Sequence, residues 1–132
     1  MKKIIVLKGE AGSGKSTALT KLVKDVFEIE LYLPKIRKDL VISFKYKNKT
    51  IAIITVGDDV PKIKRHFNRI KDKFDVLICA CRENGATFNF YNAFNRIAGY
   101  DVGFIGKKTN TDEDRERVIS KIKEIIFKQF SE

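Results

Sequence analysis

The sequence predicts an α/β fold, a three-layer sandwich in which a mostly parallel sheet lies between two layers of helices. Short apolar runs that are typical of strands alternate with segments whose apolar residues recur at helical spacing, which favours a parallel sheet covered on both faces. Most of the strand-like runs are almost continuously apolar, as strands buried on both faces are. Two of the runs are separated only by a short polar stretch, which predicts an antiparallel hairpin toward one edge of the sheet.

The predicted strands differ in how apolar they are. The first run of the hairpin, residues 41–46, alternates between apolar and polar residues, as an edge strand with one face toward water does. The second run, residues 51–56, is nearly all apolar and is predicted to be buried. Residues 30–40, interrupted by Pro34, are interpreted as a short strand or an irregular loop. In chain order, the predicted strands are residues 3–7, 41–46, 51–56, 75–81 and 100–105.

The predicted helices each carry an apolar stripe and a signal for the start of a helix. The first follows a glycine-rich turn, and the second is opened by Pro61. Thr87 is predicted to cap the third helix, and Thr111 with Asp114 resembles a capping arrangement for the last. The residues predicted to face inward are Leu19, Leu22, Val23 and Val26, then Ile63, Phe67, Ile70 and Phe74, then Tyr91, Phe94 and Ile97, and finally Val118, Ile122, Ile125 and Ile126.

The chain is interpreted as a single domain spanning residues 1–132, because its length is close to the commonest domain size. Hydrophobic residues make up 43% and charged residues 33%, which is typical of a globular protein rather than a disordered one. No apolar stretch reaches membrane-spanning length and no signal-peptide pattern is present, so we expect a cytoplasmic protein without a membrane partner. Cys79 and Cys81 are too close in sequence for an ordinary disulfide and are expected to be reduced core residues.

The stretch GEAGSGKST at residues 9–17 directly follows the apolar run IIVLK at residues 4–8. It fits the pattern G-x-x-x-x-G-K-[ST] at every fixed position, after a predicted strand and at the start of a predicted helix. The glycines let the backbone approach a ligand closely, so that successive loop amides and the positive end of the helix can hold a phosphate chain. Lys15 is predicted to contact the β- and γ-phosphates, Ser16 to ligate Mg²⁺ and Thr17 to donate near the α-phosphate. The predicted nucleotide-binding residues are Gly9, Ala11, Gly12, Ser13, Gly14, Lys15, Ser16 and Thr17.

With this motif the chain resembles the P-loop NTPases, a superfamily that contains kinases, ATPases and GTPases. The resemblance is specific at residues 9–17 and architectural over the rest of the chain. The chain is also similar, more faintly, to small P-loop proteins of bacteria and phages in which Gly-Asp ends one strand and Cys-Arg ends the next, as Gly57-Asp58 and Cys81-Arg82 do here. The resemblance implies ATP as the nucleotide, Mg²⁺ as the metal, and either hydrolysis of ATP or transfer of its γ-phosphoryl group.

P-loop enzymes hold Mg²⁺ partly through an acid at the carboxyl end of a second buried strand. Here the strand predicted at residues 51–56 is followed by Gly-Asp-Asp at residues 57–59, and Thr55 stands near the point where the usual acid would be. Asp58 is the first choice for holding the metal or positioning a water molecule. Asp59 is the second choice, and its alternative role is to cap the helix that follows.

Arg82 directly follows the strand predicted at residues 75–81, so it is expected at the carboxyl edge of the sheet, where open α/β sheets bind ligands. It is assigned a catalytic role there, neutralising charge on a transferring phosphoryl group, with a solvated surface arginine as the alternative. Together with Lys15, Ser16 and Asp58 it would complete an electrostatic cage around the phosphates.

Several other residues are weaker candidates. Asn84 and Thr87 either touch a substrate or serve a turn and a helix cap. Lys107 and Lys108 follow the last strand, where the stem of a lysine can pack on a purine ring. An aromatic cluster is either a stacking surface for nucleobases or ordinary core. Its members are Phe88, Phe90, Tyr91, Phe94 and Tyr100. His66 and Glu10 are not assigned a function.

The leading functional hypothesis is Mg²⁺-dependent hydrolysis of ATP or transfer of its phosphoryl group. The alternative is a regulatory or nucleic-acid-associated nucleotide-binding module with little turnover, which the net charge of +10 favours. That charge is also explained by lysines that solvate helix faces, since the basic residues are spread along the chain. A GTPase is disfavoured because the motif Asn-Lys-x-Asp is missing, and a small-molecule or nucleotide kinase because only Arg82 and Arg96 stand where an arginine-rich lid would lie. The phosphoryl acceptor and the oligomeric state stay open.

Overall fold

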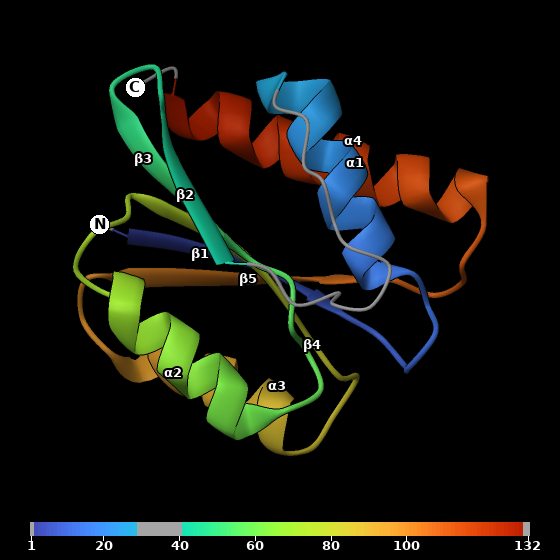
Figure 1. The fold of residues 1–132 in the computed structure, drawn as a ribbon, viewed down its shortest axis with the longest axis horizontal. Helices are drawn as coiled ribbons and strands as arrows, with labels where there is room; N and C mark the ends of the chain where they lie inside the picture. The colour runs from blue at the N-terminus through green and yellow to red at the C-terminus, as the bar shows by residue number, and fades with distance from the viewer. Residues whose placement is uncertain (1, 29–40, 131–132) are drawn as a thin grey trace.

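The computed structural model describes residues 2–28 and 41–130, and these form strands, helices and one 3₁₀ turn (Figure 1). The prediction made for residues 30–40 lies outside the described residues. The strands are β1 (Lys2–Lys8), β2 (Val41–Tyr46), β3 (Lys49–Ile54), β4 (Val76–Cys81) and β5 (Tyr100–Gly106). The helices are α1 (Lys15–Phe27), α2 (Val60–Ile70), α3 (Ala86–Asn92) and α4 (Asp112–Phe130), and the 3₁₀ turn is η1 (Ala93–Arg96).

The strands form one sheet in the order β2-β3-β4-β1-β5. The neighbours β3, β4, β1 and β5 are parallel, and β2 pairs antiparallel with β3 at one edge. The predicted fold class, α/β with a mostly parallel sheet and a hairpin at one edge, is therefore confirmed. The carboxyl ends of the parallel strands lie along the same edge of the sheet, where open α/β folds place their ligand sites.

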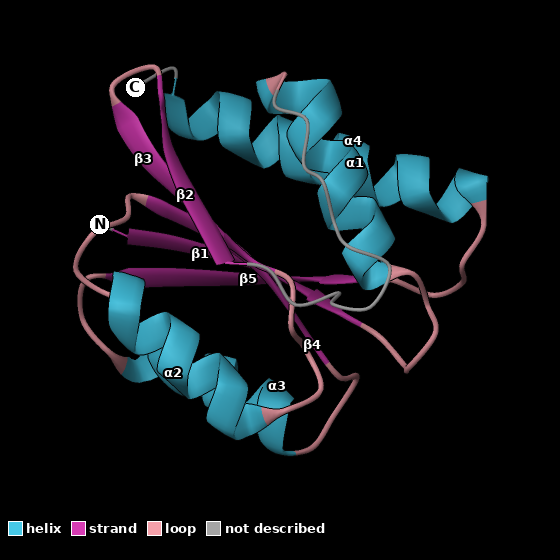
Figure 2. Ribbon diagram, in the orientation of Figure 1, coloured by secondary structure: helices cyan, strands magenta, loops and turns pink. Residues whose placement is uncertain are grey.

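Helices cover both faces of the sheet, which confirms the three layers (Figure 2). α1 and α4 pack on one face, and α2 and α3 pack on the other. Alternate residues of β1 belong to the two cores, since Ile5 and Leu7 join α1 and α4 whereas Ile4 and Val6 join α2. All four side chains are fully buried, which explains the unbroken apolar run of this strand.

Several local predictions differ from the structure. Phe74, expected on the second helix, is buried but lies beyond the end of α2. The hairpin turns through Lys47 and Asn48 alone, with φ values of 50° and 68°, as a two-residue type I′ turn requires, so Lys49 belongs to β3 rather than to the turn. The third helix is shorter than predicted, because α3 ends at Asn92 and the chain continues as η1. This change of helix type leaves Ile97 46% exposed instead of inside the core.

The aromatic cluster belongs to the core between α2 and α3. The ring of Phe67 in α2 lies 5.7 Å from the ring of Phe90 and 4.9 Å from the ring of Phe94, measured between centroids. Tyr91 is fully buried. These rings join the two helices to each other and to the sheet, which confirms the core interpretation of the cluster.

Cys79 and Cys81 are both buried and free, as predicted. Both lie on β4 and face the core that contains α2. Burial raises the pKa of Cys81 to about 12, so its thiol is neutral at physiological pH. Within residues 2–28 and 41–130, no helix combines the length and the apolar character needed to cross a lipid bilayer.

Candidate functional site

The glycine-rich stretch forms the loop between β1 and α1, at the carboxyl edge of the sheet (Figure 1). The base of this loop is held from both sides. The Gly9 amide donates to the Cys81 carbonyl of β4 (3.2 Å), and the Lys107 amide after β5 donates to the Lys8 carbonyl (2.7 Å). An ideal Cβ on Gly9 would lie 2.5 Å from the Lys107 carbonyl oxygen, so only glycine lets these two segments approach each other.

A tight turn follows the base of the loop. The Ser13 amide donates to the Glu10 carbonyl (3.1 Å), and Gly12 inside the turn has a φ of +79°. Gly14 (φ +89°) caps α1, and a side chain there would collide with the Asn110 side chain. Ser13 is buried, and its hydroxyl has no hydrogen-bond partner in the described part of the chain. Because the Ser13 amide closes the turn, it does not point to a ligand in this conformation, unlike the predicted run of inward amides.

Lys15 folds its ammonium group back onto the loop, where it donates to the carbonyls of Gly9 (2.8 Å) and Glu10 (3.0 Å). Burial and the nearby Arg82 guanidinium lower the pKa of Lys15, whereas the carboxylates of Asp58 and Glu10 act in the opposite direction. The structure therefore brings Asp58 and Arg82, the other two predicted catalytic residues, within electrostatic reach of Lys15.

The N-terminus of α1 offers further donors beside this ammonium group. The first hydrogen bond inside the helix runs from the Ala18 amide to the Gly14 carbonyl (3.0 Å), so the amides of residues 15–17 precede it and lack partners within the helix. Ser16 is half-buried and Thr17 is exposed. These amides and the positive end of the helix dipole favour an anion at this point.

The two acids that follow β3 have different surroundings. Asp59 is the N-cap of α2, and its carboxylate accepts a hydrogen bond from the Lys62 amide (3.2 Å), which confirms its alternative role. Asp58 is exposed. β4 lies between β3 and β1 in the sheet, so the axes of β3 and β1 are roughly 10 Å apart. The Asp58 carboxylate nevertheless favours the charged form of Lys15.

Arg82 begins the loop from β4 to α3 and is half-buried. Its amide donates to the hydroxyl of Thr87 (2.9 Å), which is itself buried. The prediction that Thr87 caps the third helix is wrong, because α3 already begins at Ala86 and Gly85, with a φ of +91°, occupies the N-cap position. Thr87 instead ties the first turn of α3 to Arg82. Asn84 is exposed in the same loop.

Lys107 has a structural role that the sequence does not reveal. Its side chain is fully buried, its ammonium group pairs with Asp114 of α4 (2.9 Å), and it also donates to the Thr109 carbonyl. The hypothesis that its stem packs on a purine ring is therefore wrong. Asp114 also accepts hydrogen bonds from the amides of Lys108 (2.9 Å) and Thr109 (3.1 Å) and from the Arg117 guanidinium (2.7 Å). These bonds hold the segment after β5 against the glycine loop.

The residues around the loop fit a polyphosphate with Mg²⁺. Mg²⁺ commonly binds one or two protein carboxylates together with substrate phosphates and waters, so the Ser16 hydroxyl and the Asp58 carboxylate are the groups here that could hold it. Among the described residues, no three or more His, Cys, Asp or Glu side chains gather as a metal-binding group. The buried Ser13 hydroxyl without a partner adds a polar atom inside the loop that a ligand can satisfy.

Comparisons of the chain with models of protein families, with curated proteins and with solved structures found no match. The groups around the glycine loop favour anions, because the Lys15 ammonium lies on the loop, the Arg82 guanidinium is near it, and the amides of residues 15–17 lack partners within the helix.

Replacing Gly9 by alanine should lower the free energy of unfolding by about 1–3 kcal/mol, because the added methyl group would overlap the Lys107 carbonyl and the Ser13 hydroxyl. Gly106→Ala is the matched control, since no atom lies within 4 Å of an added Cβ at that position. Urea denaturation followed by circular dichroism measures both variants. Equal stabilities of the two variants would contradict the close approach at Gly9.

The Asp114 carboxylate predicts a dependence of stability on pH. Burial alone would raise the pKa of Asp114, but hydrogen bonds from Lys107, from Arg117 and from the amides of Thr109 and Lys108 outweigh it and hold this pKa well below its usual value. A carboxylate of this kind stabilises the folded state above the ordinary aspartate pKa of about 4. It loses that contribution as the pH falls through this value toward the lowered pKa.

Asp114→Asn should lower the free energy of unfolding at neutral pH by about 3–5 kcal/mol, because Lys107 is left buried without a counter-charge. Its difference from the unchanged protein should shrink below about pH 4. Asp112→Asn is the control, since the Asp112 side chain is 91% exposed and its pair with Arg115 contributes less than about 1 kcal/mol. Urea denaturation at neutral and at acidic pH measures both differences, and a constant difference across that range would count against the assignment.

Proposed function

We propose that the chain is a P-loop protein that binds ATP with Mg²⁺ at residues 9–17 and hydrolyses it. The observation that carries this proposal is the ammonium group of Lys15, which lies on the glycine loop at the N-terminus of α1, where burial and the nearby Arg82 guanidinium disfavour its charged form. Neither cation forms an ion pair with another residue of the described ranges. An anion bound between them and the helix end would relieve this repulsion.

A polyphosphate fits this arrangement better than a single small anion. The donors come from the ends of neighbouring strands, with Lys15 after β1 and Arg82 after β4, and Asp58 follows β3 one strand further along. An extended chain with several charges can reach all of them. A carboxylate repels phosphate, so the presence of Asp58 beside these cations favours a divalent cation between the acid and the ligand.

When bound, Mg-ATP would supply the phosphoanhydride bond that is broken and the metal charge that offsets its oxygens. Lys15 already lies within hydrogen-bond reach of the loop backbone, so a phosphate in the loop can replace its two carbonyl acceptors. The Ser16 hydroxyl and the Asp58 carboxylate would hold the metal ion. Arg82 would neutralise charge that develops on the transferred phosphoryl group.

Water is proposed as the phosphoryl acceptor because residues 82–96 of the described chain do not form an arginine-rich lid. α3 carries the chain from the carboxyl edge of the sheet back toward the start of β5, so Arg96 lies near the opposite edge from Arg82. ATP is favoured over GTP because the motif Asn-Lys-x-Asp is missing after β5. The acids that follow this strand have other partners, since Asp112 pairs with Arg115 (2.6 Å) and Asp114 is bound by Lys107 and Arg117. A cytoplasmic location, where ATP is present and thiols stay reduced, fits the proposal.

Lys15→Ala should weaken binding of Mg-ATP by about 100-fold or more, because charge-assisted hydrogen bonds of about 1.5–3 kcal/mol each are lost. Calorimetry measures binding, and steady-state release of phosphate measures turnover. Lys24→Ala, which removes an exposed lysine from the same helix, should leave both unchanged. Unaltered affinity in the Lys15 variant would refute the proposed site. Tight binding without turnover in the unchanged chain would favour the regulatory module instead.

Asp58→Asn should raise the Mg²⁺ concentration needed for half-maximal phosphate release by about tenfold or more, because a metal-ligating charge is lost. Asp59→Asn is the matched variant and should leave the Mg²⁺ requirement unchanged, because asparagine caps a helix as well as aspartate does. A titration of turnover against Mg²⁺ compares the two. If the variants respond alike, Asp58 does not hold the metal.

A further inference from the structure

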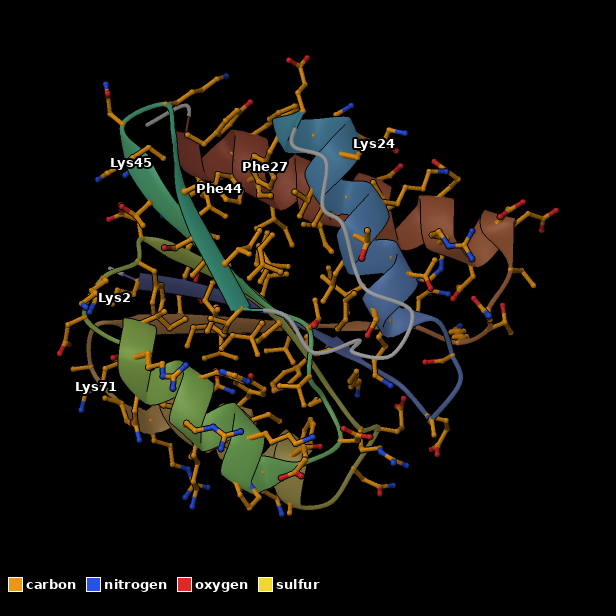
Figure 3. The ribbon with its side chains drawn as sticks, viewed as in Figure 1. Lys2, Lys24, Phe27, Phe44, Lys45 and Lys71 are labelled. Atoms are coloured by element: carbon orange, nitrogen blue, oxygen red, sulfur yellow. The ribbon has the colours of Figure 1, made fainter. Side chains whose placement is uncertain are left out.

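The positive charge of the molecule is concentrated on α2 and the short segment after it, residues 60–73. Figure 3 shows nitrogen-tipped side chains around α2, with Lys71 at the end of the helix. By contrast, the acids and bases of α4 balance, since residues 112–130 contain equal numbers of each. Residues 60–73 carry one acid, Asp72, against the bases Lys62, Lys64, Arg65, Arg69, Lys71 and Lys73.

Three exposed cations of α2 have no counter-charge among the described residues. Lys64, Arg65 and Arg69 are exposed and form no ion pair within residues 2–28 and 41–130. Asp72, the acid that follows the helix, already pairs with Lys2 (3.6 Å). Arg65 and Arg69 lie one helical turn apart, where like charges repel, and no acid stands in the first turn of the helix. This pattern destabilises the isolated helix and favours binding of an anionic partner.

The neighbouring α3–η1 segment extends this surface with amides rather than acids. Residues 84–100 contain no Asp or Glu. The segment adjoins α2, because Phe90 of α3 packs on Phe67 of α2 (5.7 Å between ring centroids). Side-chain amides are common donors to phosphate and sugar oxygens. The α2–α3 face, as we define it, consists of Lys64, Arg65, Arg69, Lys71, Lys73, Asn89, Asn92, Asn95 and Arg96, all exposed.

We propose that the α2–α3 face binds the sugar–phosphate backbone of a duplex nucleic acid. A row of unpaired cations beside amide donors complements a regular array of phosphates. A duplex is favoured over a single strand because the rings of Phe67, Phe90 and Phe94 pack on one another and leave no exposed platform for unstacked bases. A duplex is favoured over an anionic membrane because Ile97 is the only large apolar side chain exposed near this face in the described residues, and one such side chain gives little anchoring in the lipid interface.

This face is separate from the glycine loop and does not rest on the proposed hydrolysis of ATP. α2 and α3 cover one side of the sheet, whereas the loop leads into α1 on the other side (Figure 2). Binding of the duplex should therefore be measurable without nucleotide. Contacts to phosphate do not distinguish one base from another, so binding should be independent of the base sequence of the duplex.

The test measures fluorescence anisotropy of labelled DNA and RNA duplexes with the full chain, without nucleotide, over a range of salt concentrations. The variant Lys64→Gln/Arg65→Gln/Arg69→Gln should bind about tenfold more weakly or worse and should reduce the salt slope of log K by about 3. The control Lys24→Gln/Lys121→Gln/Lys123→Gln removes the same number of exposed charges from α1 and α4. It should keep the affinity of the unchanged chain within about threefold, because its charges lie on the other layer.

A charge-preserving variant, Lys64→Arg/Arg65→Lys/Arg69→Lys, separates loss of charge from loss of folding and should bind like the unchanged chain. Circular dichroism confirms the fold of every variant. Binding of the DNA duplex alone or of the RNA duplex alone would support the face and identify the source of the phosphates. Failure to bind either duplex, an equal loss in both glutamine variants, or tighter binding of a single strand or of phosphatidylserine vesicles would each overturn the proposal.

Discussion

The candidate site depends on two backbone hydrogen bonds that clamp the end of β1 between its neighbours. The Gly9 amide is bound to the Cys81 carbonyl, and the Lys107 amide is bound to the Lys8 carbonyl. The glycine loop is therefore anchored to the ends of β4 and β5 at the same time. Arg82 comes into the site because it is the next residue after Cys81. Because Gly9 has no side chain, the backbone segments after β1, β4 and β5 can approach one another closely. This close approach brings the charged residues of the site together, and the cationic side chains alone would not do so.

Most of the fold was predictable because its determinants are local in the sequence. Buried parallel strands leave continuous apolar runs and helices leave stripes at helical spacing, so each strand and helix of the described residues was expected near its observed position. β3 shows the limit of such patterns. The strand ends at Ile54, but the apolar run continues to Val56. It does so because Thr55 and Val56 stay buried (each 2% exposed) although they no longer pair with a neighbouring strand. An apolar run indicates that its residues are buried, but it does not show that they pair with a neighbouring strand.

The glycine loop was predictable for the same reason, since its residues are consecutive. The remainder of the site depends on contacts between residues that are far apart in the chain. Lys107 and Lys108 are equivalent in sequence, yet the fold buries the first against Asp114 and exposes the second. Likewise, basic residues that look evenly spread along the chain become one unbalanced surface on α2, because the charges of α4 neutralise one another. Only the tertiary structure shows which charges already have partners.

The hydrogen bonds of Lys15 have a consequence for selectivity. Its ammonium group donates to the carbonyl oxygens of Gly9 and Glu10 and so acts as a latch across the loop. A ligand must replace both carbonyl oxygens as hydrogen-bond acceptors before it can bind the Lys15 ammonium group. A weakly charged ion such as chloride offers too little in return, whereas a multiply charged oxyanion can open the latch. The two hydrogen bonds of Lys15 therefore favour multiply charged oxyanions over small monovalent ions as ligands of the loop.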